Sequence, residues 1–149
     1  QCLFTVSPIR HLKDGLHGNQ LSKANLLIAI DQICRQMDFC HYFPSYEIMI
    51  DELRDYRFYA DDMMHPSPLA IQYIWECFCD CYFTPSTLSF LKEWNKIRQG
   101  LAHRPFNPES EAYQTFLSQI LLKIEDLKEK LPYLDVQKEI KLCQAQLKK

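Results

Sequence analysis

The sequence predicts an α/β fold followed by a helical extension. Two short apolar segments with strand character each precede a loop and a segment of helical periodicity. The order strand, loop, helix, strand, loop, helix is typical of parallel strands joined by crossover helices. After residue 85 the pattern is helical throughout. We therefore expect residues 1–84 to be the C-terminal portion of an α/β domain, and residues 85–149 to be a helical extension packing on it.

The first predicted strand is the apolar segment Cys2–Val6, which ends at a Ser-Pro pair. Residues 10–20 are polar, hold two of the three glycines and are expected to form a loop. A helix over residues 22–37 follows, because Ser22 can cap it and apolar side chains then recur at steps of three and four.

The second predicted strand is Tyr46–Ile50, with Pro44 just ahead of it. A helix capped by Ser45 is the alternative for the same residues. Residues 51–61 mix charged and aromatic side chains, which suits an excursion over the surface.

Four further helices are predicted by caps, breakers and apolar periodicity. Ser67 is a good N-cap and Pro68 suits the first helical position, so a helix should run to about Cys81. Prolines at positions 105 and 132 separate the remaining segments. These are expected over residues 86–103, 109–130 and 135–147.

The bulk composition indicates a folded, nearly neutral domain. Net charge is −2 without blocks of like charge, which disfavours nucleic acid or an anionic membrane as the main partner. Seven cysteines, an odd and irregularly spaced set, favour reduced thiols in a cytoplasmic protein. No apolar run reaches the roughly 18 residues that a membrane span needs.

The strongest chemical signal is Asp62-Met-Met-His65 ahead of Pro-Ser. An aspartate three residues before a histidine, on a tight loop, can hold one ring nitrogen so that the other faces a hydroxyl nucleophile. A turn or cap without catalysis is the alternative interpretation. Ser67 is expected to be the helix cap rather than a nucleophile.

Several longer stretches resemble the GSCFA family of bacterial proteins, a branch of the SGNH, or GDSL-type, hydrolases. The similarity covers residues 3 to about 105. It rests on Thr5-Val-Ser-Pro-Ile-Arg-His11, Asp14-Gly-Leu-His-Gly-Asn19, Leu21-Ser-Lys-Ala24, Tyr42-Phe-Pro-Ser-Tyr-Glu-Ile48, Glu52-Leu-Arg-Asp-Tyr-Arg-Phe-Tyr59, Asp62-x-x-His-Pro-Ser67 and Gly100-Leu-Ala-His-Arg-Pro105.

The resemblance implies a flavodoxin-like three-layer α/β/α SGNH fold for residues 1–84. It implies a serine esterase that acts on an O-acyl ester, for example on a carbohydrate, with His65 as general base and Asp62 as its orienting acid. Neither a cofactor nor a metal is implied. The chain holds no Gly-Asp-Ser and no Gly-x-Asn-Asp sequence, so the nucleophilic serine is expected upstream of Gln1.

The expected partner follows from the absent nucleophile and from the small number of predicted strands. Two strands are too few for a parallel sheet, which is normally covered on both faces. We expect either the missing N-terminal half of the protein or a second copy of the chain to complete it. A non-enzymatic interaction module, docking through the apolar stripe from Phe116 to Leu131, is the alternative function.

Two more groups of residues are candidates for a site. Arg10, His11, His17 and Asn19 lie where the first strand ends and could line the substrate mouth; a loop ordered by its own side chains is the alternative. The alternating cysteines at 77, 79 and 81 lack the spacing of a zinc site and are interpreted as buried thiols.

Overall fold

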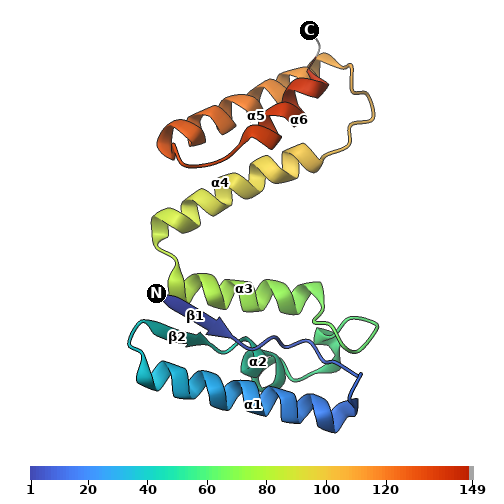
Figure 1. Cartoon of the computed structure of the whole chain (residues 1–149). Coiled ribbons are helices and arrows are strands. Elements are labelled where there is room, and N and C mark those ends of the chain that lie inside the picture. Colours follow the sequence, from blue (N-terminus) through green and yellow to red (C-terminus); the bar gives the residue numbers. More distant parts are fainter. Residues whose placement is uncertain (148–149) are drawn as a thin grey trace. The chain divides into compact units, whose positions relative to one another are not determined.

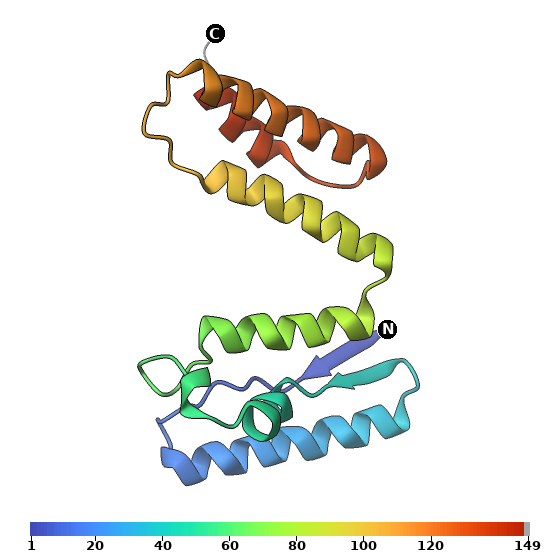
Figure 2. The ribbon, with the colours of Figure 1, turned by 180° about the vertical axis from the view of Figure 1, so that it is seen from behind.

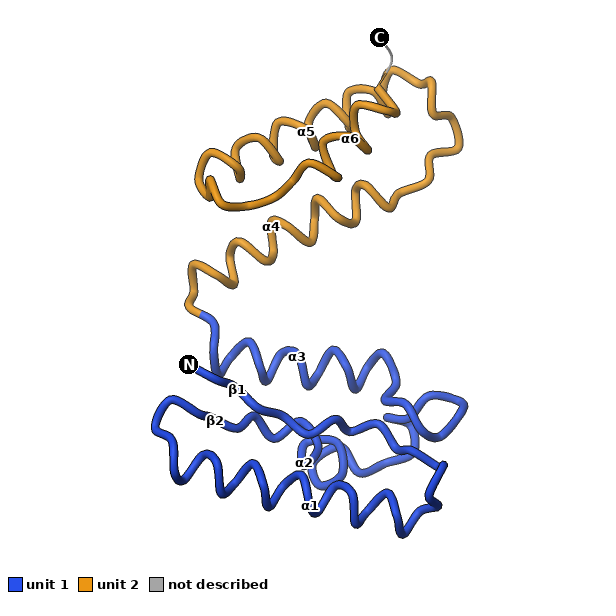
Figure 3. The backbone as a smooth tube through the Cα atoms, in the orientation of Figure 1, with its two compact units in different colours: residues 1–83 blue, residues 84–149 orange. Residues whose placement is uncertain are grey.

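The computed structural model describes residues 1–147. The chain divides into two compact units, residues 1–83 and residues 84–149, which Figure 3 shows in different colours. Each has its own core, so the two units are described separately.

The first unit contains both strands. Its order is β1 (Cys2–Thr5), α1 (Gly15–Gln36), β2 (Cys40–Phe43), α2 (Ser45–Glu47), the π-helix η1 (Ile48–Leu53), the 3₁₀ helix η2 (Tyr56–Phe58) and α3 (Pro68–Tyr82). Figures 1 and 2 show α1 and α3 on either side of the two strands.

The two strands run parallel and are joined by α1. Cys2 pairs with Cys40 and Thr5 with Phe43. The carboxyl ends of both strands therefore lie at the same edge of the sheet, and the segments that leave this edge build the candidate site. The Phe78 ring of α3 packs edge-on against Phe43, with ring centroids 5.2 Å apart.

The expected flavodoxin-like three-layer fold is wrong. Within residues 1–147 the sheet has only two strands, and the chain is mainly helical. Two strands do not form the wide central sheet that such a fold requires. A parallel strand pair joined by a crossover helix is present, but its second strand is β2 and not the predicted segment, and no strand follows β2 within residues 1–147.

The predicted strand at residues 46–50 is helical, and the true second strand lies earlier, at Cys40–Phe43. The buried side chains Tyr46, Met49 and Leu53 recur at steps of three and four, which is the spacing of a helix face. The alternative of a helix was therefore the better interpretation, although its N-cap is Pro44 and not Ser45.

Helix α1 begins at Gly15, seven residues before the predicted start at 22. The buried positions of its first turns are polar, Asn19 and Lys23, while Leu16 and Leu21 are exposed. Apolar periodicity therefore could not reveal this part of the helix. As a result, His17 and Asn19 lie on a helix and not in the predicted loop.

Helix α3 matches its prediction. The Ser67 hydroxyl accepts a hydrogen bond from the Ala70 amide, and Pro68 occupies the first turn. Behind α3 lies the core of the first unit, formed by Met49, Leu53, Tyr59 and Ala70.

The second unit consists of α4 (Pro85–Ala102), α5 (Glu111–Lys130) and α6 (Gln137–Gln146), close to the predicted spans. Its core is a separate cluster of buried apolar side chains: Ile97, Ile120, Ile124, Leu127, Val136 and Cys143. The apolar stripe that was considered as a docking face contributes three of these residues, so it serves the core of its own unit.

Among residues 1–147, no helix combines the length and the apolar character needed to cross a membrane.

Candidate active site

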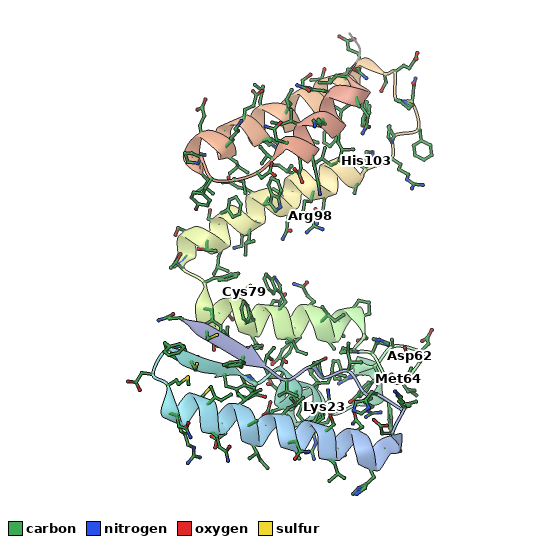
Figure 4. All side chains as sticks on the ribbon, viewed as in Figure 1. Lys23, Asp62, Met64, Cys79, Arg98 and His103 are labelled. Carbon is green, nitrogen blue, oxygen red and sulfur yellow. The ribbon has the colours of Figure 1, made fainter. Side chains whose placement is uncertain are left out.

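The site is built on a closed loop between η2 and α3. Tyr59 and Pro66 form an antiparallel bridge at its base. Above the bridge, the Ala60 amide donates to the His65 carbonyl at 2.8 Å, and the Met63 amide donates to the Ala60 carbonyl at 2.9 Å. We call residues 59–66 the base turn. Its closed hydrogen bonding fixes the backbone from which Asp62 and His65 project. Figure 4 labels Asp62 and Met64 of this turn.

The two oxygens of Asp62 have different partners. Oδ1 accepts the backbone N–H groups of Met64 at 2.9 Å and His65 at 3.0 Å, and so organises the turn. Oδ2 lies 2.6 Å from His65 Nδ1. The carboxylate therefore orients both the backbone and the ring of the same histidine.

These contacts set the protonation of the pair. Hydrogen bonds from the His65 and Met64 amides, followed by the bond to the His65 ring, lower the pKa of Asp62 to about 2. An ionised carboxylate is only an acceptor, so Nδ1 of His65 must carry the proton. In the neutral ring Nε2 then has its lone pair available, which is the state that a general base needs.

The pair is open to solvent. The side chains of His65 and Asp62 retain 54% and 40% of their exposure. A ligand or a second protein segment can therefore reach the His65 ring without any rearrangement of the chain.

Arg10 lies against the base turn. Its amide donates to the Met64 carbonyl at 3.1 Å, and its guanidinium donates to the Met63 carbonyl at 3.2 Å. The guanidinium carbon also lies 4.0 Å from the centroid of the Tyr59 ring. Of the four residues predicted to line the substrate mouth, Arg10 is the one that forms hydrogen bonds with this turn.

The other three candidates have different surroundings. Asn19 is buried, and its Oδ1 accepts the His11 amide at 3.1 Å, so it orders the segment after β1. The His11 ring lies 3.9 Å from the Asp14 carboxylate. His17 is exposed near the start of α1. The structure therefore joins Arg10 to the Asp62–His65 pair and gives Asn19 a supporting contact.

An apolar groove with a volume of about 480 Å³ begins beside the base turn. Pro66, which follows His65, lines it together with residues of β1 and α3 that include Leu3, Ile71, Trp75 and Phe78. The volume is within the range of small-molecule sites. Its lining includes Thr5 of β1 and Phe43 of β2, so the groove lies between the two strands and α3.

Two family models match the sequence. The model described as GSCFA family covers residues 1–78, and the model described as GSCFA domain protein, C-terminal domain covers residues 94–149. The chain belongs to the GSCFA family. The second match includes the last forty residues, where sequence motifs had revealed no resemblance. No curated protein and no solved structure matches the chain significantly.

Sequence reasoning missed one residue near the site of this GSCFA chain. Lys23 of α1 is only 7% exposed, and its ammonium group donates to the Ser7 carbonyl at 2.5 Å. Burial lowers the pKa of Lys23. The signal was its place in the family stretch Leu21-Ser-Lys-Ala24, but a lysine on an exposed helix is so common that no role followed from the sequence.

The cysteines of α3 take up places that differ from the expected ones. On the GSCFA chain Cys79 is buried, Cys77 is half-buried and Cys81 is exposed, so the middle thiol is the most enclosed. Burial raises the pKa of the Cys79 thiol, which keeps it protonated and unreactive. The interpretation as buried thiols therefore holds for Cys79 and not for Cys81.

Proposed function

We propose that this chain supplies the general-base part of a serine acyl-hydrolase of the SGNH type. The supporting observation is the 2.6 Å contact between His65 Nδ1 and an Asp62 carboxylate whose pKa is lowered to about 2. This arrangement presents Nε2 as a proton acceptor at an exposed position.

The proposed reaction follows from that geometry. A serine hydroxyl attacks the carbonyl carbon of an O-acyl ester while His65 Nε2 accepts the hydroxyl proton. The imidazolium formed is stabilised by Asp62 through Nδ1, and it then protonates the leaving alcohol. Water, deprotonated by the same ring, releases the acyl group from the serine. A carbohydrate ester is one substrate of this class.

The nucleophilic serine of this proposal belongs to a polypeptide segment outside residues 1–149, because these residues hold no Gly-Asp-Ser sequence. Within residues 1–147, β1 pairs only with β2, so its other edge is open to a further strand. A strand added there in parallel would end at the same sheet edge as β1, beside the base turn. The apolar groove, which Leu3 and Thr5 of β1 help to line, gives such a segment a surface on which to pack.

We also place the protein in the cytoplasm. The support is its seven cysteines, which are unpaired in the structure.

Labelling with a fluorophosphonate ester probe tests the proposal on the gene product that contains this chain. The probe should phosphonylate a serine outside residues 1–149 with release of fluoride, and His65→Ala should lower the rate of labelling by about 10³-fold or more, as loss of a triad base does. His103→Ala, at an exposed histidine of the second unit, is the matched control and should leave the rate unchanged. The absence of labelling in the unsubstituted protein would instead favour a non-enzymatic interaction module.

A further inference from the structure

We propose that Arg10 is a positioning residue that holds the base turn in the geometry that His65 needs, and that Asn19 and Lys23 fix the segment carrying Arg10. The inference deepens the proposed function, because it concerns how the same Asp62–His65 pair is maintained. This positioning role differs from the substrate contact predicted for Arg10, which stays a prediction.

Arg10 contacts the base turn at two places. Its amide and its guanidinium donate to two consecutive carbonyls, those of Met64 and Met63, on the strained side of the turn, where Met63 has a φ of 58°. Its guanidinium also lies over the ring of Tyr59, at the base of the turn. The guanidinium thus links Tyr59, at the base of the turn, to Met63, while the backbone amide of Arg10 holds Met64.

The guanidinium holds the turn without competing for the carboxylate. In the described part of the chain, the ion pair of Asp62 is with His65 and not with an arginine. A guanidinium bound to Asp62 would occupy the oxygens that orient the imidazole. By bonding to a carbonyl instead, Arg10 leaves Oδ2 to the ring.

The segment that carries Arg10 is itself anchored by buried polar groups. Lys23 donates to the Ser7 carbonyl at 2.5 Å, and Ser45 donates through its hydroxyl to the Val6 carbonyl at 2.8 Å. Asn19 accepts the His11 amide on the other side of Arg10.

The three anchoring side chains are 3–7% exposed and come from α1 and α2. Buried polar groups of this kind hold their partners firmly, because a lost partner leaves a desolvated group unsatisfied. The segment that carries Arg10 is therefore held rigidly in place next to the base turn.

The tautomer of His65 tests the inference directly. In the chain labelled with ¹⁵N-histidine, at about pH 9 where histidines are neutral, Nδ1 of His65 should carry the proton and Nε2 should have the shift of an unprotonated nitrogen. Arg10→Met should abolish this preference and give a mixture of tautomers, seen as averaged shifts of the two ring nitrogens. Lys23→Met should weaken the same preference.

Arg57→Met is the matched control. The Arg57 guanidinium also stacks on an aromatic ring, 4.9 Å from the Phe58 centroid, but it belongs to η2, ahead of the turn. This variant should keep the unsubstituted tautomer. Unchanged amide signals from β1 and β2 would show that Arg10→Met is folded.

The outcomes separate the two ideas. A fully retained Nδ1–H tautomer in folded Arg10→Met would overturn the positioning role and leave the proposed function intact. A proton on Nε2 in the unsubstituted chain would instead contradict the general-base geometry of the proposed function itself.

Discussion

At the scale of single residues, Asp62 makes the contacts that organise the site. One of its oxygens caps the turn by accepting two amides, and the other orients the His65 ring. An aspartate whose side chain bonds the backbone two and three residues ahead is a local motif that any turn can use. The additional contact to the ring at 2.6 Å is what distinguishes this turn from a simple cap.

The lowered pKa of Asp62 predicts how the turn responds to acid. Because the pKa of Asp62 in the folded chain, about 2, lies below its ordinary value of 3.8, the contribution of the ionised carboxylate to stability is fully present above pH 3.8. It should be lost as the pH falls from 3.8 through about 2. Titration of the Asp62 carboxyl carbon by NMR measures this, and a midpoint near 3.8 would contradict the proposed hydrogen bonding.

Met63 predicts a second effect at the same turn. Its φ of 58° lies in the left-handed region, which costs a residue with a side chain about 1–2 kcal/mol. Met63→Val should destabilise the first unit by about 1 kcal/mol or more, because a branched Cβ tolerates this region least. Met63→Gly should be neutral or slightly stabilising. Urea unfolding of both variants gives the comparison, and equal losses would argue against strain at Met63.

At the scale of elements, the base turn depends on the start of α3. The Ser67 hydroxyl accepts the Ala70 amide, while the Ser67 amide donates to the Phe58 carbonyl. One residue therefore both caps the helix and closes the loop that carries His65.

Ser67→Ala should lower the free energy of unfolding of the first unit by about 1 kcal/mol, the usual effect of losing an N-cap. Thr84→Ala removes the equivalent cap of α4 and is the control, since it should affect the second unit instead. Hydrogen exchange of amides in α3 and α4 reports on each unit. Equal protection of α3 in Ser67→Ala and in the unsubstituted chain would contradict this role.

Helix α1 shows how a tertiary role can hide an element from sequence patterns. In its first turns, the side chains of Asn19 and Lys23 point inward. They form hydrogen bonds with backbone groups of the segment after β1. Hydropathy marks both positions as solvent-exposed, so the predicted start at 22 was too late. Only the position of the neighbouring chain segment explains why polar groups are buried there.

At the scale of the whole molecule, the two cores differ in what they leave uncovered. In the second unit, helices α4–α6 enclose a continuous cluster of buried side chains. In the first unit, Leu3, Ile71 and Trp75 line a groove and remain 40–57% exposed. Together with the open edge of β1, this is the surface on which the proposed partner segment would pack.

The open edge and groove predict self-association when residues 1–149 are isolated. The mass in solution should exceed that of a monomer, because apolar surface beside an unpaired strand favours pairing. Leu3→Lys should shift the mass toward the monomer, since it places a charge in the groove. Leu142→Lys, at an exposed leucine of α6, is the control. A monomer at all concentrations in sedimentation equilibrium would argue against an exposed docking edge.

The sequence by itself determined the local features: the caps and breakers that bound α3 and the later helices, and the Asp62–His65 spacing within one turn. These depend on residues three or four apart, so the chain encodes them without reference to the rest of the fold. Tertiary structure decided the features that link distant residues. The number of strands, the helical state of residues 45–53 and the placement of Arg10 against Met63 all depend on contacts between distant parts of the chain, such as Ser45 with Val6 and Arg10 with Met63, which are 39 and 53 residues apart. Hydropathy patterns carry no information about such contacts, because the sequence does not distinguish a polar residue that is buried in the fold from one that is exposed to solvent.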